Sequence, residues 1–149
     1  MIRVTHDIRG ADYKAVVARA CERYTSFSLV WRDQFTFAPS ALDIQRELQP
    51  FEITREHTDR WPGTELSGHK ALVIRYSTRA CSIGIMERAT SLFGWLASEL
   101  PEDIAFYRAD DSCAIVTISH ERDAIFYDDD WMQLLPTSAK PEVEETTKT

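Results

Sequence analysis

The feature that most constrains the fold of this chain is a series of short apolar stretches near its C-terminal end. Stretches at 104–108, 113–119 and 124–127 have the length and composition of β-strands, and the polar segments 109–112 and 120–123 separate them. Strands joined by such short turns pair antiparallel, because a parallel pair needs a crossover of a dozen or more residues. The pattern therefore predicts an antiparallel meander and argues against a doubly wound parallel sheet.

Further strands are expected upstream of the meander. In residues 27–31, Phe27, Leu29 and Trp31 alternate with Ser28 and Val30, which predicts a strand. Phe35 and Phe37 suggest a second short strand after a turn. Residues 51–57 have the pattern of a half-exposed strand, and 70–76 are apolar on both faces, as in a central strand. The Pro62-Gly63 pair between them is typical of a type II turn.

Three segments have helical spacing. Apolar residues in 12–24 recur every three or four positions, with Asp12 as the expected N-cap, and Ser40 is the expected cap of a shorter helix that ends before Pro50. The longest predicted helix covers 79–99, with close packing expected at Gly84 and Gly94.

These elements predict one α+β domain over residues 1–136. We expect two or three helices packed on one face of a mostly antiparallel sheet of about five or six strands. Residues 137–149 contain almost no large side chain, which predicts a disordered acidic tail.

Charge and hydropathy limit the possible partners. The chain has 24 acidic and 17 basic residues, a formal charge of −7, and no basic cluster, so we expect no nucleic-acid partner. No apolar run approaches the roughly 18 residues of a membrane helix, and the first residues lack the apolar core of a signal peptide. We therefore expect a cytoplasmic protein with no membrane partner.

The three cysteines, Cys21, Cys81 and Cys113, are isolated and lie in apolar surroundings. They form no CxxC pair, and their odd number does not suggest a set of disulfide bonds. We therefore expect buried free thiols in a reducing compartment.

The most chemically suggestive segment is the turn after the second meander strand. His120, Glu121 and Asp123 come close together there, and a histidine with two carboxylates can transfer protons or hold a metal ion. The same residues also suit a plain solvated turn. A second possible pair, His57 and His69, flanks the Pro62-Gly63 turn but has no known ligand spacing.

Two acidic turns, at 110–111 and 128–130, contain candidate binding residues. They lack the alternating oxygen ligands and the glycine of a calcium loop. They suit either solvated turns or an acidic docking face with an aromatic anchor beside it. The residues of this candidate face are Asp110, Asp111, Asp128, Asp129, Asp130 and Trp131, with His120 and Glu121 as further binding candidates.

The segments 100–108 and 118–123 together resemble a pattern in small bacterial immunity-type proteins, which lie beside polymorphic toxins and neutralise them by binding. The resemblance covers the last third of the folded part. It implies a non-enzymatic cytoplasmic protein that blocks a toxin domain, and it transfers no functional residue.

The sequence favours a non-enzymatic protein-binding module, most concretely an immunity-type inhibitor of a basic toxin. It contains no nucleophile elbow and no phosphate loop, and we assign no catalytic residue, no metal ligand and no cofactor. The main alternative is a small metal-dependent or acid–base enzyme centred on His120 and Glu121. A structural or small-ligand-binding domain, with a cleft lined by Trp61, Tyr76 and Arg79, is a third possibility.

Overall fold

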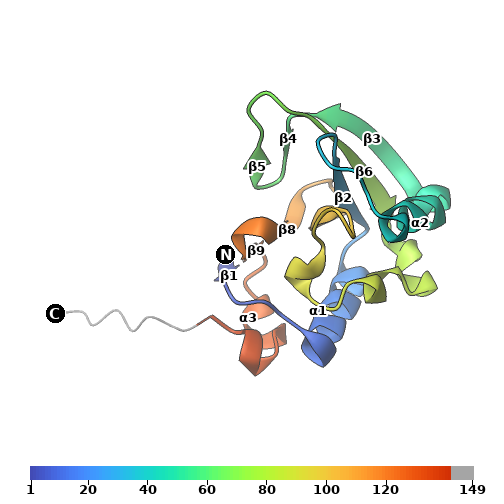
Figure 1. Ribbon diagram of the computed structural model, residues 1–149. Helices are drawn as coiled ribbons and strands as arrows, with labels where there is room; N and C mark the ends of the chain where they lie inside the picture. The colour runs from blue at the N-terminus through green and yellow to red at the C-terminus, as the bar shows by residue number, and fades with distance from the viewer. Residues whose placement is uncertain (142–149) are drawn as a thin grey trace.

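A computed structural model describes residues 1–141 of the chain. Its main feature is one seven-stranded sheet (Figure 1). The strands are β1 Ile2–Val4, β2 Ser26–Arg32, β3 Glu52–Thr58, β6 Ala71–Ser77, β7 Glu102–Tyr107, β8 Cys113–Ile118 and β9 Asp123–Phe126. They lie in the order β1-β9-β8-β7-β2-β6-β3, and each neighbouring pair is antiparallel. The predicted α+β class and the C-terminal meander are confirmed.

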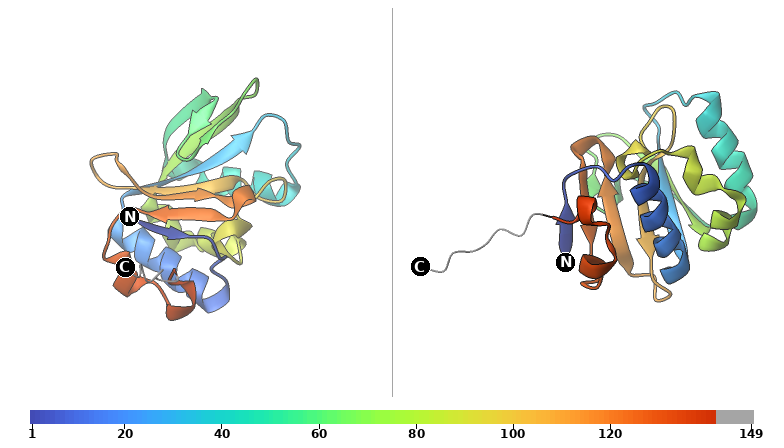
Figure 2. Two further views of the ribbon diagram at one scale, coloured as in Figure 1. Left: turned by 90° about the vertical axis from the view of Figure 1, so that its left-hand side faces the viewer. Right: turned by 90° about the horizontal axis from the view of Figure 1, so that it is seen from below.

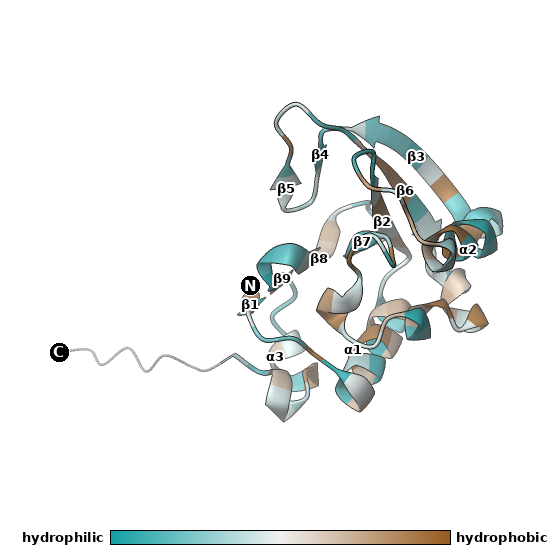
Figure 3. Ribbon diagram, in the orientation of Figure 1, coloured by the Kyte–Doolittle hydropathy of each residue, from teal (hydrophilic) through white to brown (hydrophobic). Residues whose placement is uncertain are grey.

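Strand β2 lies near the middle of the sheet and is buried along its whole length. Its alternation assigns its side chains to two faces: Phe27, Leu29 and Trp31 join the main core under the helices, whereas Val30 belongs to a smaller cluster on the other face. The outer strand β3 is mostly hydrophilic, as Figure 3 shows, and five of its residues are exposed. The sheet is therefore buried on both faces at its centre and open at the β3 edge.

The helices cover one face of this sheet (Figure 2). They are α1 Gly10–Arg23, α2 Pro39–Leu48 and the short α3 Trp131–Leu134, with a 3₁₀ turn at Gln49–Phe51 after α2. The predicted apolar face of α1 is buried, but its N-cap is Arg9, and Asp12 lies in the first turn. Ser40 does not cap α2 either; its hydroxyl donates to the carbonyl of Glu99.

The long helix expected at 79–99 is wrong. The segment forms three short 3₁₀ helices, η2 Thr78–Ile83, η3 Ile85–Arg88 and η4 Leu92–Gly94. Gly84 ends the first in the left-handed conformation at φ 74°, and Ala89 and Ser91 are extended. Most apolar residues of the expected helical face still reach the core, because 3₁₀ turns repeat them at a similar spacing, but Leu96 is exposed.

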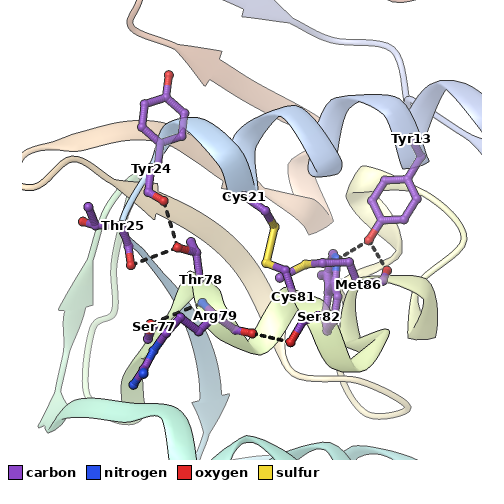
Figure 4. Close-up of a disulfide and its surroundings, with 11 residues drawn as sticks. Tyr13, Cys21, Tyr24, Thr25, Ser77, Thr78, Arg79, Cys81, Ser82 and Met86 are labelled. Atoms are coloured by element: carbon purple, nitrogen blue, oxygen red, sulfur yellow. Dashed lines mark hydrogen bonds between the residues drawn. A yellow bond between two sulfur atoms is a disulfide. The ribbon is translucent and has the colours of Figure 1, made fainter.

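The expectation of three free thiols is wrong for two of them. Cys21 on α1 and Cys81 on η2 form a disulfide with their Cα atoms 6.4 Å apart (Figure 4). Cys113 remains a free, half-buried thiol, and burial raises its pKa to about 11. The sequence spacing gave no sign of the pair, because 60 residues separate its members and only the packing of η2 on α1 brings them together.

A small hairpin covers part of the face opposite the helices. Its strands are β4 Arg60–Trp61 and β5 Thr64–Glu65, joined by the predicted Pro62-Gly63 turn. Figure 1 shows the hairpin leaning from the β3–β6 side of the sheet toward β8. At its tip, a Cβ on Gly63 would lie 2.8 Å from Val116 and 2.9 Å from Ile118, so the turn touches β8 directly.

Two further expectations fail at particular residues. Phe35 and Phe37 form no strand: Phe35 is exposed at a turn, and Phe37 packs edge-on against Trp31 just before Pro39 begins α2. Residues 137–141 do not behave as a tail, since Thr137–Ala139 form a 3₁₀ turn in which Ala139 is buried. The rest of the predicted tail, 142–149, lies outside the described residues.

No helix within residues 1–141 has both the length and the apolar composition needed to cross a bilayer.

Candidate functional site

Three side chains capable of holding a metal ion meet at one end of the sheet. Glu102 and Asp103 begin β7, and His120 lies in the 3₁₀ turn η5 Ser119–Glu121 between β8 and β9. One ligand atom from each residue lies within 4.8 Å of the others, and no other group of this kind occurs among the residues that the structure describes. We call Glu102, Asp103 and His120 the carboxylate–histidine cluster.

A bulge in β7 explains why two consecutive residues share one site. In a regular strand, neighbouring side chains point to opposite faces. The pairing of β2 with β7 runs from Ser28↔Ala105 to Val30↔Glu102, so β7 has one extra residue there. Asp103 takes the left-handed conformation, at φ 55°, within this extra step. Bulges and such strained residues are concentrated beside functional sites, which makes this end of the sheet the candidate site.

Asp103 is held from two directions. The indole N–H of Trp61, on the hairpin, donates to Asp103 Oδ2 at 3.0 Å, and the backbone N–H of Ser119 donates to Oδ1 at 2.9 Å. The residue is 1% exposed. These two bonds fix the carboxylate in place, and each oxygen retains a lone pair for a further partner.

Glu102 faces a buried arginine. Arg32 Nη2 lies 3.0 Å from Glu102 Oε2, and the two side chains are 10% and 3% exposed. Neither of these two atoms has a well-formed hydrogen bond, so the ion pair leaves donor and acceptor capacity unused. The Arg32 guanidinium also lies 5.3 Å from the centre of the Trp61 ring, which links the pair to the hairpin.

Ionisation of both Glu102 and Asp103 at the same time is unfavourable. Burial raises the pKa of Asp103, and the hydrogen bonds from Ser119 and Trp61 only partly oppose it. Burial also raises the pKa of Glu102, and the neighbouring Asp103 charge raises it further. Removal from water disfavours an ionised carboxylate, and a like charge nearby adds to the effect.

The structure changes the predicted partners of His120. Its imidazole is at the open side of the cluster, with the side chain 45% exposed, and Nε2 is 3.9 Å from Glu121 Oε1. Glu121 is 62% exposed, and Asp123 accepts two hydrogen bonds from Arg3 instead of meeting His120. The structure therefore groups His120 with Glu102 and Asp103, and not with the predicted carboxylate Asp123.

The acidic turns are at the other end of the sheet. Strand β8 separates them from His120 by six residues, about 20 Å at the usual rise. Ion pairs engage four of their five aspartates: Asp111 with Arg75, Asp128 with Arg108 and Arg23, Asp129 with the N-terminal ammonium, and Asp130 with Arg23. The fifth, Asp110, accepts hydrogen bonds from Ser112. The aspartates of both turns are thus engaged in pairs within the chain, while Asp111, Asp129 and Asp130 stay exposed.

Trp131 is not an exposed anchor. The residue is fully buried, because its ring packs 5.1 Å from that of Phe126 and its N–H donates to the Tyr24 hydroxyl. The two histidines at the Pro62-Gly63 turn form no site either: His57 contacts Asp33 at 2.6 Å, and His69 is exposed in the segment before β6.

Four residues of the site were not identified from the sequence: Arg32, Trp61, Glu102 and Asp103. A signal was present for Arg32, because strand alternation places it on the same face as Ser28 and Val30, where a charge needs a partner. The adjacent acids Glu102 and Asp103 directly precede an apolar strand, which is also a signal, but the bulge that unites them depends on pairing with β2.

Segments 100–108 and 118–123 together supply the whole cluster. Segment 100–108 contains Glu102 and Asp103, and segment 118–123 contains His120. Comparison of the chain with protein families, with curated proteins and with solved structures finds no match.

Proposed function

We propose that this protein binds one divalent transition-metal ion at the carboxylate–histidine cluster. The observation that carries the proposal is a charge imbalance: two buried carboxylates face one buried guanidinium, that of Arg32. An uncompensated buried charge is unfavourable, and the group takes up either a proton or a cation. A metal ion between Glu102, Asp103 and His120 would neutralise the excess charge.

The donor set fits a particular class of ion. One imidazole and two carboxylates suit zinc or manganese better than calcium or magnesium, which prefer oxygen ligands alone. The bonds from Trp61 and Ser119 to Asp103 and the Arg32–Glu102 pair match the outer contacts that orient carboxylate ligands at metal sites. Three protein ligands leave a coordination position for water, as at hydrolytic zinc sites. Metal-dependent hydrolysis is the enzymatic form of this proposal.

Calorimetric titration with zinc chloride tests metal binding. We expect one zinc ion per chain, and at least about tenfold weaker binding after His120→Ala, because even outer contacts to a metal contribute 10–100-fold. His69→Ala is the matched control, since it removes an exposed histidine that lies outside the cluster. Its affinity should equal that of the unmodified protein.

Two outcomes would overturn the proposal. One is the absence of zinc and manganese binding at pH 7 to the folded protein, which would leave a proton as the neutralising group. The other is equal loss of affinity in both histidine variants. Asp103→Asn serves as a second variant, because it keeps the shape of the side chain, and circular dichroism shows whether each variant is folded.

Protein binding, including the role of an immunity-type inhibitor in the cytoplasm, stays a prediction. The net charge of −7 still favours a basic partner. The buried Trp131 no longer supports an aromatic anchor for an acidic face, whereas Asp111, Asp129 and Asp130 remain exposed in surface ion pairs. Within residues 1–141, the open β3 edge is a surface that suits a protein partner.

A further inference from the structure

We propose a second site, independent of the metal cluster: the groove between the β4–β5 hairpin and the sheet binds a small organic monocarboxylate. The groove has a volume of about 240 Å³. Its floor is the face of β7, β2, β6 and β3 that the helices leave open, and Trp61 and Pro62 of the hairpin form its apolar wall.

Arg75 supplies the positive charge. It extends from β6 into the lining of the groove, its side chain is 19% exposed, and its guanidinium carbon lies 3.8 Å from the centre of the Tyr107 ring. One of its nitrogens donates to Asp111 at 2.8 Å. Asp111 is 79% exposed and screened by water, so that pair is weak. A guanidinium has five N–H donors in a planar fork, and the remaining ones match a carboxylate.

A pair of hydroxyl groups adds a further donor. Ser28 Oγ and Tyr107 Oη lie 2.9 Å apart, and both side chains line the groove. One hydroxyl hydrogen forms the bond between them, which leaves the other free to donate to a ligand oxygen. Arg75, Ser28 and Tyr107 therefore combine a fixed cation with neutral donors on one side of the groove.

The volume of the groove and the charges that line it limit the class of ligand further. The volume is below the 300–1,000 Å³ that is usual for drug-sized pockets, so a small metabolite fits better. The apolar surfaces of Trp61, Pro62 and Val73 suit a planar or aliphatic body. Glu56 on β3 also lines the groove and disfavours a dianion such as a phosphate monoester. Arg60 lines it too, but its charge is paired with Asp59 and Glu65. A monocarboxylate with a compact apolar body satisfies all three conditions.

The test uses benzoate as the probe, followed by NMR of the backbone amides of the full chain. Benzoate should shift the amides of Val73, Arg75 and Tyr107 in a saturable way, whereas benzamide, which has the same shape without the charge, should bind at least about tenfold more weakly. Arg75→Gln should weaken benzoate binding by a similar factor. Arg55→Gln is the matched control, because the register places Arg55 opposite Ile74 of the helix-covered core, away from the groove.

Tyr107→Phe is the second variant, since it removes only a hydroxyl and should weaken benzoate binding severalfold in a folded protein. His120→Ala should leave benzoate binding unchanged, which separates this site from the metal cluster. Three results overturn the proposal: equal affinity for benzoate and benzamide, amide shifts that fall outside the groove, or full binding by both folded groove variants.

Discussion

At the scale of single residues, Asp103 and Glu102 couple the stability of the domain to pH. Their pKa values are raised above those of the unfolded chain, so the native state holds their protons more tightly between the two values. Their contribution to stability is fully present below the unfolded pKa, near about 4, and is lost as pH rises through the folded pKa. Asp110 and Asp128 act in the opposite direction, because their pKa values are lowered.

Urea unfolding of the unmodified protein and Asp103→Asn from pH 4 to pH 7, with a chelator present, isolates this effect. The free energy of unfolding of the unmodified protein should fall relative to that of the variant as pH rises, because the variant lacks the carboxylate. Zinc should remove the difference in slope. Parallel curves for the two proteins would contradict the assigned cause.

The sequence indicated which segments carry chemically reactive side chains better than it indicated which residues those side chains contact. The turn at 120–123 suggested a histidine–carboxylate site or a plain solvated turn, and in the structure His120 lies near Glu102 and Asp103. Its true partners follow from the β7 bulge, which is set by pairing with a strand some 70 residues earlier. Trp131 illustrates the reverse case: the adjacent aspartates suggested exposure, yet Tyr24 and Phe126 bury the ring.

At the scale of elements, the hairpin β4–β5 matters most, since Trp61 both binds Asp103 and forms a wall of the groove. Its position depends on Gly63, which has φ 85° and touches β8. Gly63→Ala should lower the free energy of unfolding by about 2–4 kcal/mol, from left-handed backbone strain plus overpacking.

Gly68→Ala is the control for that substitution. Gly68 has a similar φ of 77°, but a Cβ there would meet nothing within 4 Å, so only the backbone strain of about 1–2 kcal/mol applies. Chemical denaturation of both variants measures the difference. Equal losses would mean that the contact with Val116 and Ile118 contributes nothing to holding the hairpin.

Elements with a clear apolar pattern could be predicted from the sequence. Elements that are interrupted by residues with left-handed or extended backbone conformations could not. Strands β2 and β8 are short runs that are buried along nearly their whole length, and the apolar content of each run alone indicates this. The segment 78–94 has helical spacing, but Gly84 and the extended Ala89 and Ser91 divide it into 3₁₀ turns. Periodicity records which residues are buried and is insensitive to such interruptions.

At the scale of the whole molecule, the Cys21–Cys81 disulfide joins α1 to the irregular segment that covers the core. It spans 60 residues of chain, and loop closure of that size stabilises a fold by about 4 kcal/mol. Reduction should therefore lower the midpoint of urea unfolding substantially, and Cys81→Ser should do the same without reductant. Cys113→Ser is the control, because that thiol is free.

If oxidised and reduced protein unfold at the same urea concentration, the disulfide has no role in stability. Disulfides persist mainly in oxidising compartments. The cytoplasmic location expected from free thiols therefore loses the support that the cysteines gave it.

The pairing of β1 with β9 has a consequence for how the chain is made. Ile2 lies opposite Phe126, so β1 has no partner in the sheet until β9 has been synthesised. The N-terminal residues must remain unpaired during that time, and the sheet can be completed only after translation has passed β9. The β1–β9 pairing joins residues more than 100 positions apart, and such long-range contacts raise the contact order and slow folding.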